Sequence, residues 1–268
     1  MRFISSFTFI WIIFICNYVH ADVLLNKVIK SENRTPEYVL RDKYRNPEET
    51  LLFFGIKQNM KVIELQPSGG NSPGGWYTEI LAPYLKENGL LIAAHFNPKE
   101  SDWRARMRRG FEERVKYNND FNKIKMSVLS MPPVKLTEDS SVDMVVTFRN
   151  LHNWLKSGYL KNVFQVSFNA LKKGGIFGVV EHRAPENFNI SKMKASGYVT
   201  ESLAIKLATE VGFILVDKSE INANKKDKKN YPKGVWTLPP TLKLKDKNKE
   251  KYLMIGESDR MTLKFVKP

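Results

Sequence analysis

The sequence predicts an α/β protein built on one mostly parallel sheet, and two observations carry that prediction. Short apolar runs typical of strands alternate along the chain with longer amphipathic segments typical of helices. A glycine-rich stretch joins the first such run to the helix after it, as expected where a parallel strand enters a crossover. The 268 residues show no internal repeat and are enough for one large domain or two small ones.

The predicted elements follow one another in βαβ order. The strands are expected at residues 61–67, 90–96, 124–129, 142–148, 176–182, 213–218 and 261–266. The helices between them are expected at residues 78–88, 98–119, 155–171 and 200–211. A helical lead-in at 22–58 precedes the main domain at 59–268, and a polar, lysine-rich insertion at 222–259 precedes the last strand.

Residues 1–21 have the order of a secretory signal peptide. Arg2 precedes an apolar run at 7–15, and the small residue Ala21 precedes the expected cleavage point. The run is shorter than the roughly 20 residues that span a membrane, so an anchor is the less favoured alternative. We therefore expect a protein that is periplasmic or secreted. Cys16, the single cysteine, lies in this leader, so we expect no disulfide or thiol chemistry in the mature chain.

The chain is strongly basic, with 43 Lys+Arg against 28 Asp+Glu and a net charge of +15. Such a balance favours anionic partners, but scattered lysines are more often a solvated surface. The lysine runs at 225–229 and 243–251 lie in the polar insertion and favour the second interpretation. No arginine-rich arm or RNA-type aromatic motif is present, so the sequence carries no specific nucleic-acid signal.

The turn after the first predicted strand is rich in glycine and is a candidate ligand site. Gly69, Gly70, Gly74 and Gly75 permit positive φ angles and a close approach of the backbone to a ligand. The helix that follows would direct its first N–H groups into the same space. Glu64, near the end of the strand, could accept hydrogen bonds from a cationic or hydroxylated ligand.

The same turn contains a literal G-x-S-x-G at residues 70–74, the pattern of the serine hydrolase nucleophile elbow. In that elbow the backbone N–H of the residue after the serine contributes to the oxyanion hole. Here Pro73 follows Ser72 and has no N–H, which disfavours a hydrolase.

Three histidines lie at or just beyond the ends of predicted strands: His95, His152 and His182. Because parallel strands end at one edge of the sheet, these side chains could face one crevice. Proton transfer or substrate positioning is the favoured role. The spacing of these histidines matches no metal motif, so no metal site is predicted.

The ends of the fourth and fifth predicted strands are rich in polar side chains. Arg149, Asn150 and His152 follow the fourth strand, and Glu181 lies at the end of the fifth. Glu181 could act as a base or an electrostatic anchor, with a rim ion pair to Arg183 as an equal alternative.

Several stretches together resemble class I S-adenosylmethionine-dependent methyltransferases, in particular bacterial predicted methyltransferases with signal peptides. The matching stretches lie at residues 62–65, 73–78, 147–154, 171–175, 180–183, 196–199 and 234–240. The resemblance covers roughly residues 30–268 and implies a Rossmann-like sheet in the order 3-2-1-4-5-7-6, with strand 7 antiparallel.

The resemblance also implies a cofactor and a place for it. S-adenosylmethionine would bind with its amino-acid end at Glu64 and the glycine turn, and Trp76 could pack against the adenine or the acceptor. The second strand of such proteins usually ends in an acidic residue that binds the ribose. Here His95 and Asn97 stand there and are the candidates for that contact.

The function expected is methyl transfer to an unknown acceptor, either a small molecule or an anionic component of the cell envelope. His152 or Glu181 would remove the acceptor's proton, with Asn150 beside them as a third candidate catalytic residue. A non-catalytic binding protein with the same fold is the alternative, and a serine hydrolase is the least favoured.

Overall fold

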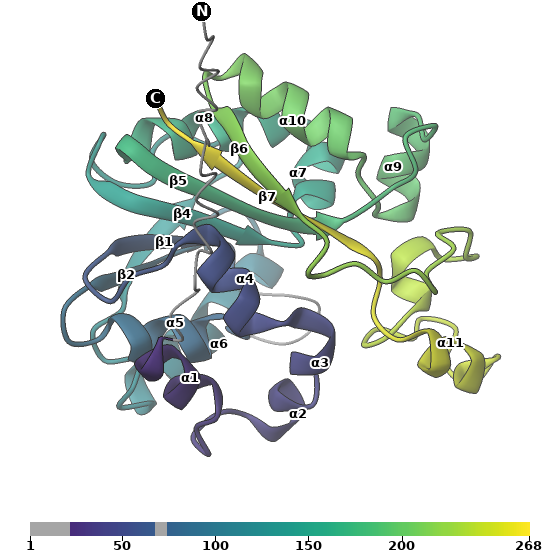
Figure 1. The fold of residues 1–268 in the computed structure, drawn as a ribbon, viewed down its shortest axis with the longest axis horizontal. Helices are drawn as coiled ribbons and strands as arrows, with labels where there is room; N and C mark the ends of the chain where they lie inside the picture. Colours follow the sequence, from purple (N-terminus) through teal and green to yellow (C-terminus); the bar gives the residue numbers. More distant parts are fainter. Residues whose placement is uncertain (1–21, 68–73) are drawn as a thin grey trace, which may run out of the picture.

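The computed structural model describes residues 22–67 and 74–268, so the signal-peptide prediction lies outside the described residues. A seven-stranded sheet in the order β3-β2-β1-β4-β5-β7-β6 forms its centre, which confirms the predicted order (Figure 1). Only β7 runs antiparallel to its neighbours. The strands are β1 (Lys61–Leu65), β2 (Leu90–Phe96), β3 (Lys125–Leu129), β4 (Val142–Phe148), β5 (Leu171–His182), β6 (Ile214–Ser219) and β7 (Arg260–Val266).

Helices cover both faces of the sheet (Figure 1). On one face lie α1 (Val23–Ile29), α4 (Pro47–Phe54), α5 (Thr78–Leu85) and α6 (Asp102–Tyr117), with the short α2 (Pro36–Val39) and α3 (Asp42–Arg45) between the first two. The other face carries α7 (Leu151–Ser157), α8 (Leu160–Ala170), α9 (Ile190–Ser196) and α10 (Glu201–Glu210). The 3₁₀ helix η1 (Gly234–Thr237) and α11 (Lys249–Ile255) lie beyond the end of β5.

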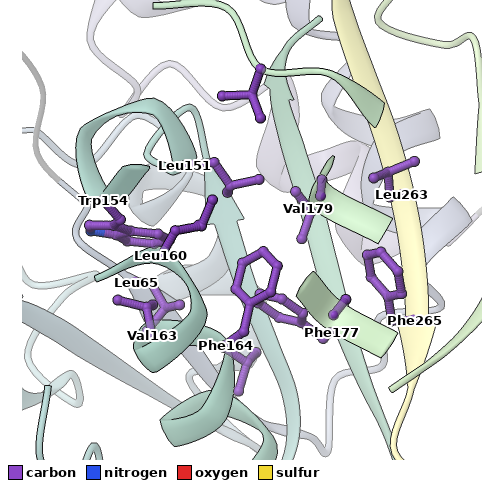
Figure 2. Packing of buried hydrophobic residues seen from close by; sticks show 14 of the residues in the cluster. Leu65, Leu151, Trp154, Leu160, Val163, Phe164, Phe177, Val179, Leu263 and Phe265 are labelled. Carbon is purple, nitrogen blue, oxygen red and sulfur yellow. The ribbon is translucent and has the colours of Figure 1, made fainter. Parts of the chain in front are cut away.

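The larger core lies between the sheet and the helices α7, α8 and α10. Figure 2 shows Phe164 of α8 beside Phe177 of β5, and Val163 of the same helix beside Leu65 of β1. Phe177 and Phe213 stack with ring centroids 5.1 Å apart and interplanar angle 21°. In β1, β2 and β5 alternate residues enter this core and residues between them enter the opposite one, as in a sheet covered on both faces.

The lead-in at 22–58 packs directly on the sheet. Leu51 and Phe54 of α4 are fully buried, and Phe54 lies against Gly178 in the middle of β5. A Cβ at Gly178 would stand 2.7 Å from the Phe54 ring, so only glycine admits the helix this close. The lead-in is therefore part of the core of this domain.

The structure corrects three sequence-based boundaries. The helix expected at 155–171 is two helices, because Gly158 adopts φ +84° and ends α7, which begins already at Leu151. Strand β5 begins at Leu171 instead of 176, since Leu171 pairs with Val142. The insertion at 222–259 contains η1 and α11. Within residues 22–67 and 74–268, no helix is long and apolar enough to cross a membrane.

We predict that Phe54→Ala destabilises the whole domain. Removing a fully buried phenylalanine leaves a cavity beside Gly178 and should lower the free energy of unfolding by about 3–5 kcal/mol. Phe53→Ala, the same change at a half-buried neighbour, should cost clearly less. Urea unfolding measures both, and equal losses would contradict the placement of α4 in the core.

Candidate functional site

Two adjoining cavities open at the carboxyl ends of β1 and β4. The smaller, which we call the glycine-side cavity, has a volume of about 80 Å³ and is lined by residues that include Glu64, Gly74 and Gly75. The larger, the histidine-side cavity, has a volume of about 570 Å³, within the range of small-molecule sites. Both cavities are bordered by Arg41, Gln66, Phe148, Arg149 and Asn150.

Asn150 holds the ends of β1 and β4 together. Its buried amide nitrogen donates to the Leu65 carbonyl at 3.0 Å and to the Thr147 hydroxyl at 3.3 Å. Gln66 and Arg149, the residues just after the two strands, adopt positive φ angles of 50° and 63°. Such strained backbone in non-glycine residues is characteristic of functional sites. The amide nitrogen of Asn150 is used in these bonds, which gives this residue a positioning role, and the catalytic role expected for it stays a prediction.

Glu64 lies at the bottom of the glycine-side cavity. Its carboxylate is buried and accepts a hydrogen bond from the Thr78 hydroxyl at 2.6 Å. Burial raises the pKa of Glu64 to about 7, although the Thr78 hydrogen bond opposes the shift. The carboxyl group therefore lacks a cationic partner among the described residues, and a cationic ligand in the cavity would supply one.

The end of the glycine turn approaches the cavity in a conformation that favours glycine. Gly74 and Gly75 have φ angles of 89° and 92°. Arg114 of α6 donates to the Gly74 carbonyl and pairs with Glu79 at 2.5 Å, which anchors this end of the turn. Gly69, Gly70 and the Ser72 of the hydrolase pattern lie outside the described residues.

The structure places His95 and Asn97 away from the described cavity walls. His95 is fully buried between the sheet and α6, with its ring 5.0 Å from that of Phe111. The alternation along β2 turns His95 to this face and leaves Phe96 to line the histidine-side cavity. Asn97 accepts from the Lys99 N–H at 3.1 Å. The ribose contact expected of His95 is corrected, because its ring is buried against α6, whereas the contact expected of Asn97 stays a prediction.

Trp76 lines the glycine-side cavity but is buried under the lead-in. Its indole N–H donates to the Tyr38 carbonyl at 2.9 Å, and the Arg45 guanidinium lies 4.6 Å from its ring centroid. These contacts occupy the ring, so Trp76 closes the cavity wall. On the other side Trp154 donates to the Gln66 side chain at 2.8 Å and braces the β1 end.

His152 and Glu181 form a buried pair at the wall of the histidine-side cavity. His152 Nδ1 lies 3.0 Å from the Glu181 carboxylate, which also accepts the His152 backbone N–H at 3.2 Å. A carboxylate beside Nδ1 favours a proton on that nitrogen, so Nε2 is left as an acceptor. The pair has the geometry of a base oriented by an acid, whereas the sequence offered the two residues as alternative bases. The rim alternative for Glu181 is excluded, since it is fully buried and Arg183 pairs with Asp259, Glu201 and Glu220.

His182 completes the histidine cluster. Its ring centroid lies 5.3 Å from that of His152, and its Nδ1 lies 2.5 Å from the Ser258 hydroxyl. Burial lowers the pKa of His182 well below its ordinary value, and the positive charge of Arg149 adds to the shift. This imidazole is therefore neutral and suited to hydrogen bonding.

His152, Glu181 and His182 bring ligand atoms within 4.8 Å of one another and have the residue types of a metal site. Two features oppose a cation there. Glu181 and His152 Nδ1 are already hydrogen-bonded to each other, and buried arginines stand beside the cluster. The arrangement suits proton transfer better than metal binding.

An arginine cluster that sequence reasoning missed borders the same cavities. Its members come from distant segments: Arg41 and Arg45 of the lead-in, Arg149 after β4, Glu257 before β7, and Arg260 at the start of β7. Glu257 pairs with Arg41 at 2.6 Å, with Arg45 at 3.4 Å and with Arg260. The dense polar run at 257–260, directly before a strand, was the available signal.

The Glu64 pKa makes the stability of the domain pH-dependent. Between about 4.5 and about 7 the folded protein keeps a proton that the unfolded chain has lost, so the free energy of unfolding falls as pH rises. Glu64→Gln should remove this loss and be more stable than the wild type by about 2–3 kcal/mol at pH 8, but not at pH 4. Urea unfolding at both pH values measures it, with the exposed Glu113→Gln as control. A wild-type pH profile in Glu64→Gln would contradict the assignment.

Comparison with known proteins finds similarity in structure only. No family model matches the chain, and no curated protein sequence matches it significantly. A SAM-dependent methyltransferase from Aquifex aeolicus matches with TM-score 0.55 and 13% identity over 91% of this chain and 98% of its own. A geranyl diphosphate methyltransferase in complex with SAM matches with TM-score 0.53 and 11% identity over 91% and 95%.

The [4+2]-cyclase SpnF matches with TM-score 0.60 and 12% identity over 94% of both chains. A likeness at these identities concerns the fold, and the fold of SpnF carries a different chemistry. Together with the strand order, the comparisons show that this chain has the Rossmann-like fold of class I S-adenosylmethionine-dependent methyltransferases.

Proposed function

We propose that the protein is an S-adenosylmethionine-dependent methyltransferase that uses His152 as a general base. One observation carries the proposal: the buried His152–Glu181 pair borders a cavity of about 570 Å³ that adjoins the glycine turn. In open α/β sheets this edge is where ligands bind, and an oriented imidazole there can accept a proton.

In this proposal the cofactor's amino-acid end lies in the glycine-side cavity. Gly74 and Gly75 bring the backbone close, and Gly69 and Gly70 of the same turn are assigned with them. Glu64 faces the ammonium group, whose charge would draw the buried carboxyl group into its ionised form. The adenosine extends past the ends of β2 and β3, where Phe96, Trp103 and Met131 line the larger cavity with apolar surface.

The acceptor occupies the part of the histidine-side cavity that His152 and Trp236 line, where the two rings contact each other edge to face with centroids 5.9 Å apart. When bound, S-adenosylmethionine supplies a methyl group on a cationic sulfur that keeps the bonding electrons as the methyl group leaves. The protein aligns the acceptor, which provides most of the acceleration. The acceptor's proton passes to His152 Nε2, and the Glu181 carboxylate stabilises the imidazolium that forms.

Export belongs to the same proposal. The signal-peptide order of residues 1–21 supports an acceptor in the cell envelope, either a small molecule or an anionic envelope component. A binding protein without turnover is the competing function, since the match to a [4+2]-cyclase is an example of this fold in a protein named for another chemistry.

We predict that His152→Ala lowers methyl transfer by about 10²-fold or more, the scale of a lost general base. Envelope and cytosolic extracts incubated with methyl-labelled S-adenosylmethionine provide the acceptor, and the label should enter envelope material. S-adenosylhomocysteine affinity should stay within about threefold, because His152 lies in the part of the histidine-side cavity assigned to the acceptor and does not line the glycine-side cavity.

Asn153→Ala is the matched control, since Asn153 lines the same cavity but is exposed. Equal labelling by the wild type and His152→Ala would exclude the general base. No labelling by any variant in any fraction would favour the binding protein. A parallel loss of thermal stability and S-adenosylhomocysteine affinity would assign His152 a structural role.

A further inference from the structure

We propose that Arg41, Arg149 and Arg260 bind a carboxylate or phosphate group of the methyl acceptor. The naming of the acceptor rests on the proposed function, whereas the anion site rests on the arginine cluster alone. All three side chains line the histidine-side cavity, which His152 also lines. The acceptor would therefore be an anion that is held at one end and methylated at the other.

The arginine cluster holds more positive than negative charge. Four guanidinium groups interact with the single carboxylate of Glu257, namely those of Arg41, Arg45, Arg149 and Arg260. Burial alone would raise the pKa of Glu257, but these charges outweigh it and hold the pKa well below its usual range. Glu257 is the carboxylate that all four share, and the buried Glu181 adds a weaker attraction on Arg149, so positive charge remains in excess in a largely buried place. Uncompensated buried charge is costly, and a bound anion would reduce that cost.

Several N–H groups of the arginine cluster have no acceptor among the described residues. Among the described residues, Arg41 Nη2, Arg45 Nη2 and Arg260 Nε are buried and have no hydrogen-bond partner. Arg260 is buried to 2% exposure, and its other nitrogens bond to the Tyr44 carbonyl and to Glu257. Buried guanidinium groups in native proteins are normally satisfied, so the missing acceptors point to a ligand.

Arg149 is the least engaged of the four arginines, and it lines both cavities. Within the described part of the chain its side chain makes no ion pair and no hydrogen bond. Burial lowers the pKa of Arg149 to about 10, so the group is still charged at neutral pH. Its backbone is held at φ 63° by an N–H bond to the Val180 carbonyl at 2.7 Å. This constrained backbone holds the charged Arg149 side chain at the border of both cavities.

The other residues that line the cavity indicate the chemistry of the rest of the ligand. Phe148 and Trp236 offer apolar surface near the cluster, and Phe148 is fixed by stacking on Tyr77 at 3.5 Å between centroids. Guanidinium groups bind carboxylate and phosphate through paired N–H donors. The geometry therefore suits a compact anion with an aromatic or aliphatic body.

The experiment measures binding of three probes by calorimetry at constant ionic strength: inorganic phosphate, benzoate, and benzamide as the neutral counterpart of benzoate. At least one of the two anions should bind the wild type, and benzoate should bind more tightly than benzamide. Arg149→Gln should weaken anion binding by about tenfold or more, the scale of a lost charged hydrogen bond. Arg109→Gln, which removes the same charge from the exposed face of α6, should bind like the wild type.

A second arm identifies the source of the anion. Repeated with saturating S-adenosylhomocysteine, anion binding should persist if the cluster serves the acceptor. Displacement by S-adenosylhomocysteine would assign the cluster to the cofactor's own carboxylate and overturn the proposal. If S-adenosylhomocysteine fails to bind at all, the proposed function fails, while the anion titrations still decide the site.

The remaining outcomes are equally decisive. No binding of either anion by the wild type, or equal binding by Arg149→Gln and Arg109→Gln, would overturn the anion site. Thermal unfolding checks that each variant is folded. Should Arg149→Gln not fold, Arg41→Gln takes its place, since Arg41 lines the same cavity and is partly exposed. Arg149→Lys keeps the charge without the paired donors and should retain part of the affinity.

Discussion

The order of the sheet reverses between β1 and β4, which are paired neighbours from distant parts of the chain. From β1 the chain continues to β2 and β3 on one side, and from β4 it continues to β5 on the other. The connections after the two strands therefore diverge and leave a crevice at their carboxyl ends. Both cavities lie there, and Asn150 fixes the two strand ends that border them.

Charge divides this crevice into two parts. The glycine-side cavity contains Glu64. Burial raises the pKa of this acid, and no cationic group among the described residues offsets that effect. The histidine-side cavity is bordered by guanidinium groups that share one carboxylate. A cationic cofactor beside the acid and an anionic acceptor beside the arginines would satisfy both parts together. Part of the positive charge of the chain, which is +15 in all, therefore lies in this buried arginine cluster and not on surface lysines.

Much of the fold could be predicted from the sequence because its signals are local. Strand β2 and strand β4 have the predicted bounds, since apolar runs ended by polar or glycine residues mark a buried strand. The break between α7 and α8 was missed because Gly158 lies inside an otherwise periodic helical pattern.

The site was predicted less completely because its parts come from separate segments. The sequence named His152 and Glu181 separately as candidates, and the structure brings them together because β4 and β5 end at one edge of the sheet. His95 was misplaced because the pattern of β2, apolar on both faces, does not reveal which face carries the cavity. Arg41, Arg45 and Glu257 could not be assigned, because only the packing of the lead-in against the last strand brings them together.

The most direct test of the account is a calorimetric titration of S-adenosylhomocysteine into three proteins: the wild type, Gly74→Val and Gly158→Val. Gly74 and Gly158 have φ angles of 89° and 84°, so valine strains both backbones similarly. A Cβ placed at Gly158 would meet no atom within 4 Å beyond its chain neighbours, whereas Gly74 lines the glycine-side cavity, to which the cofactor is assigned. The account predicts binding by the wild type and Gly158→Val, and a loss of about tenfold or more in Gly74→Val. Absence of binding by the wild type, or undiminished binding by a folded Gly74→Val, would contradict it.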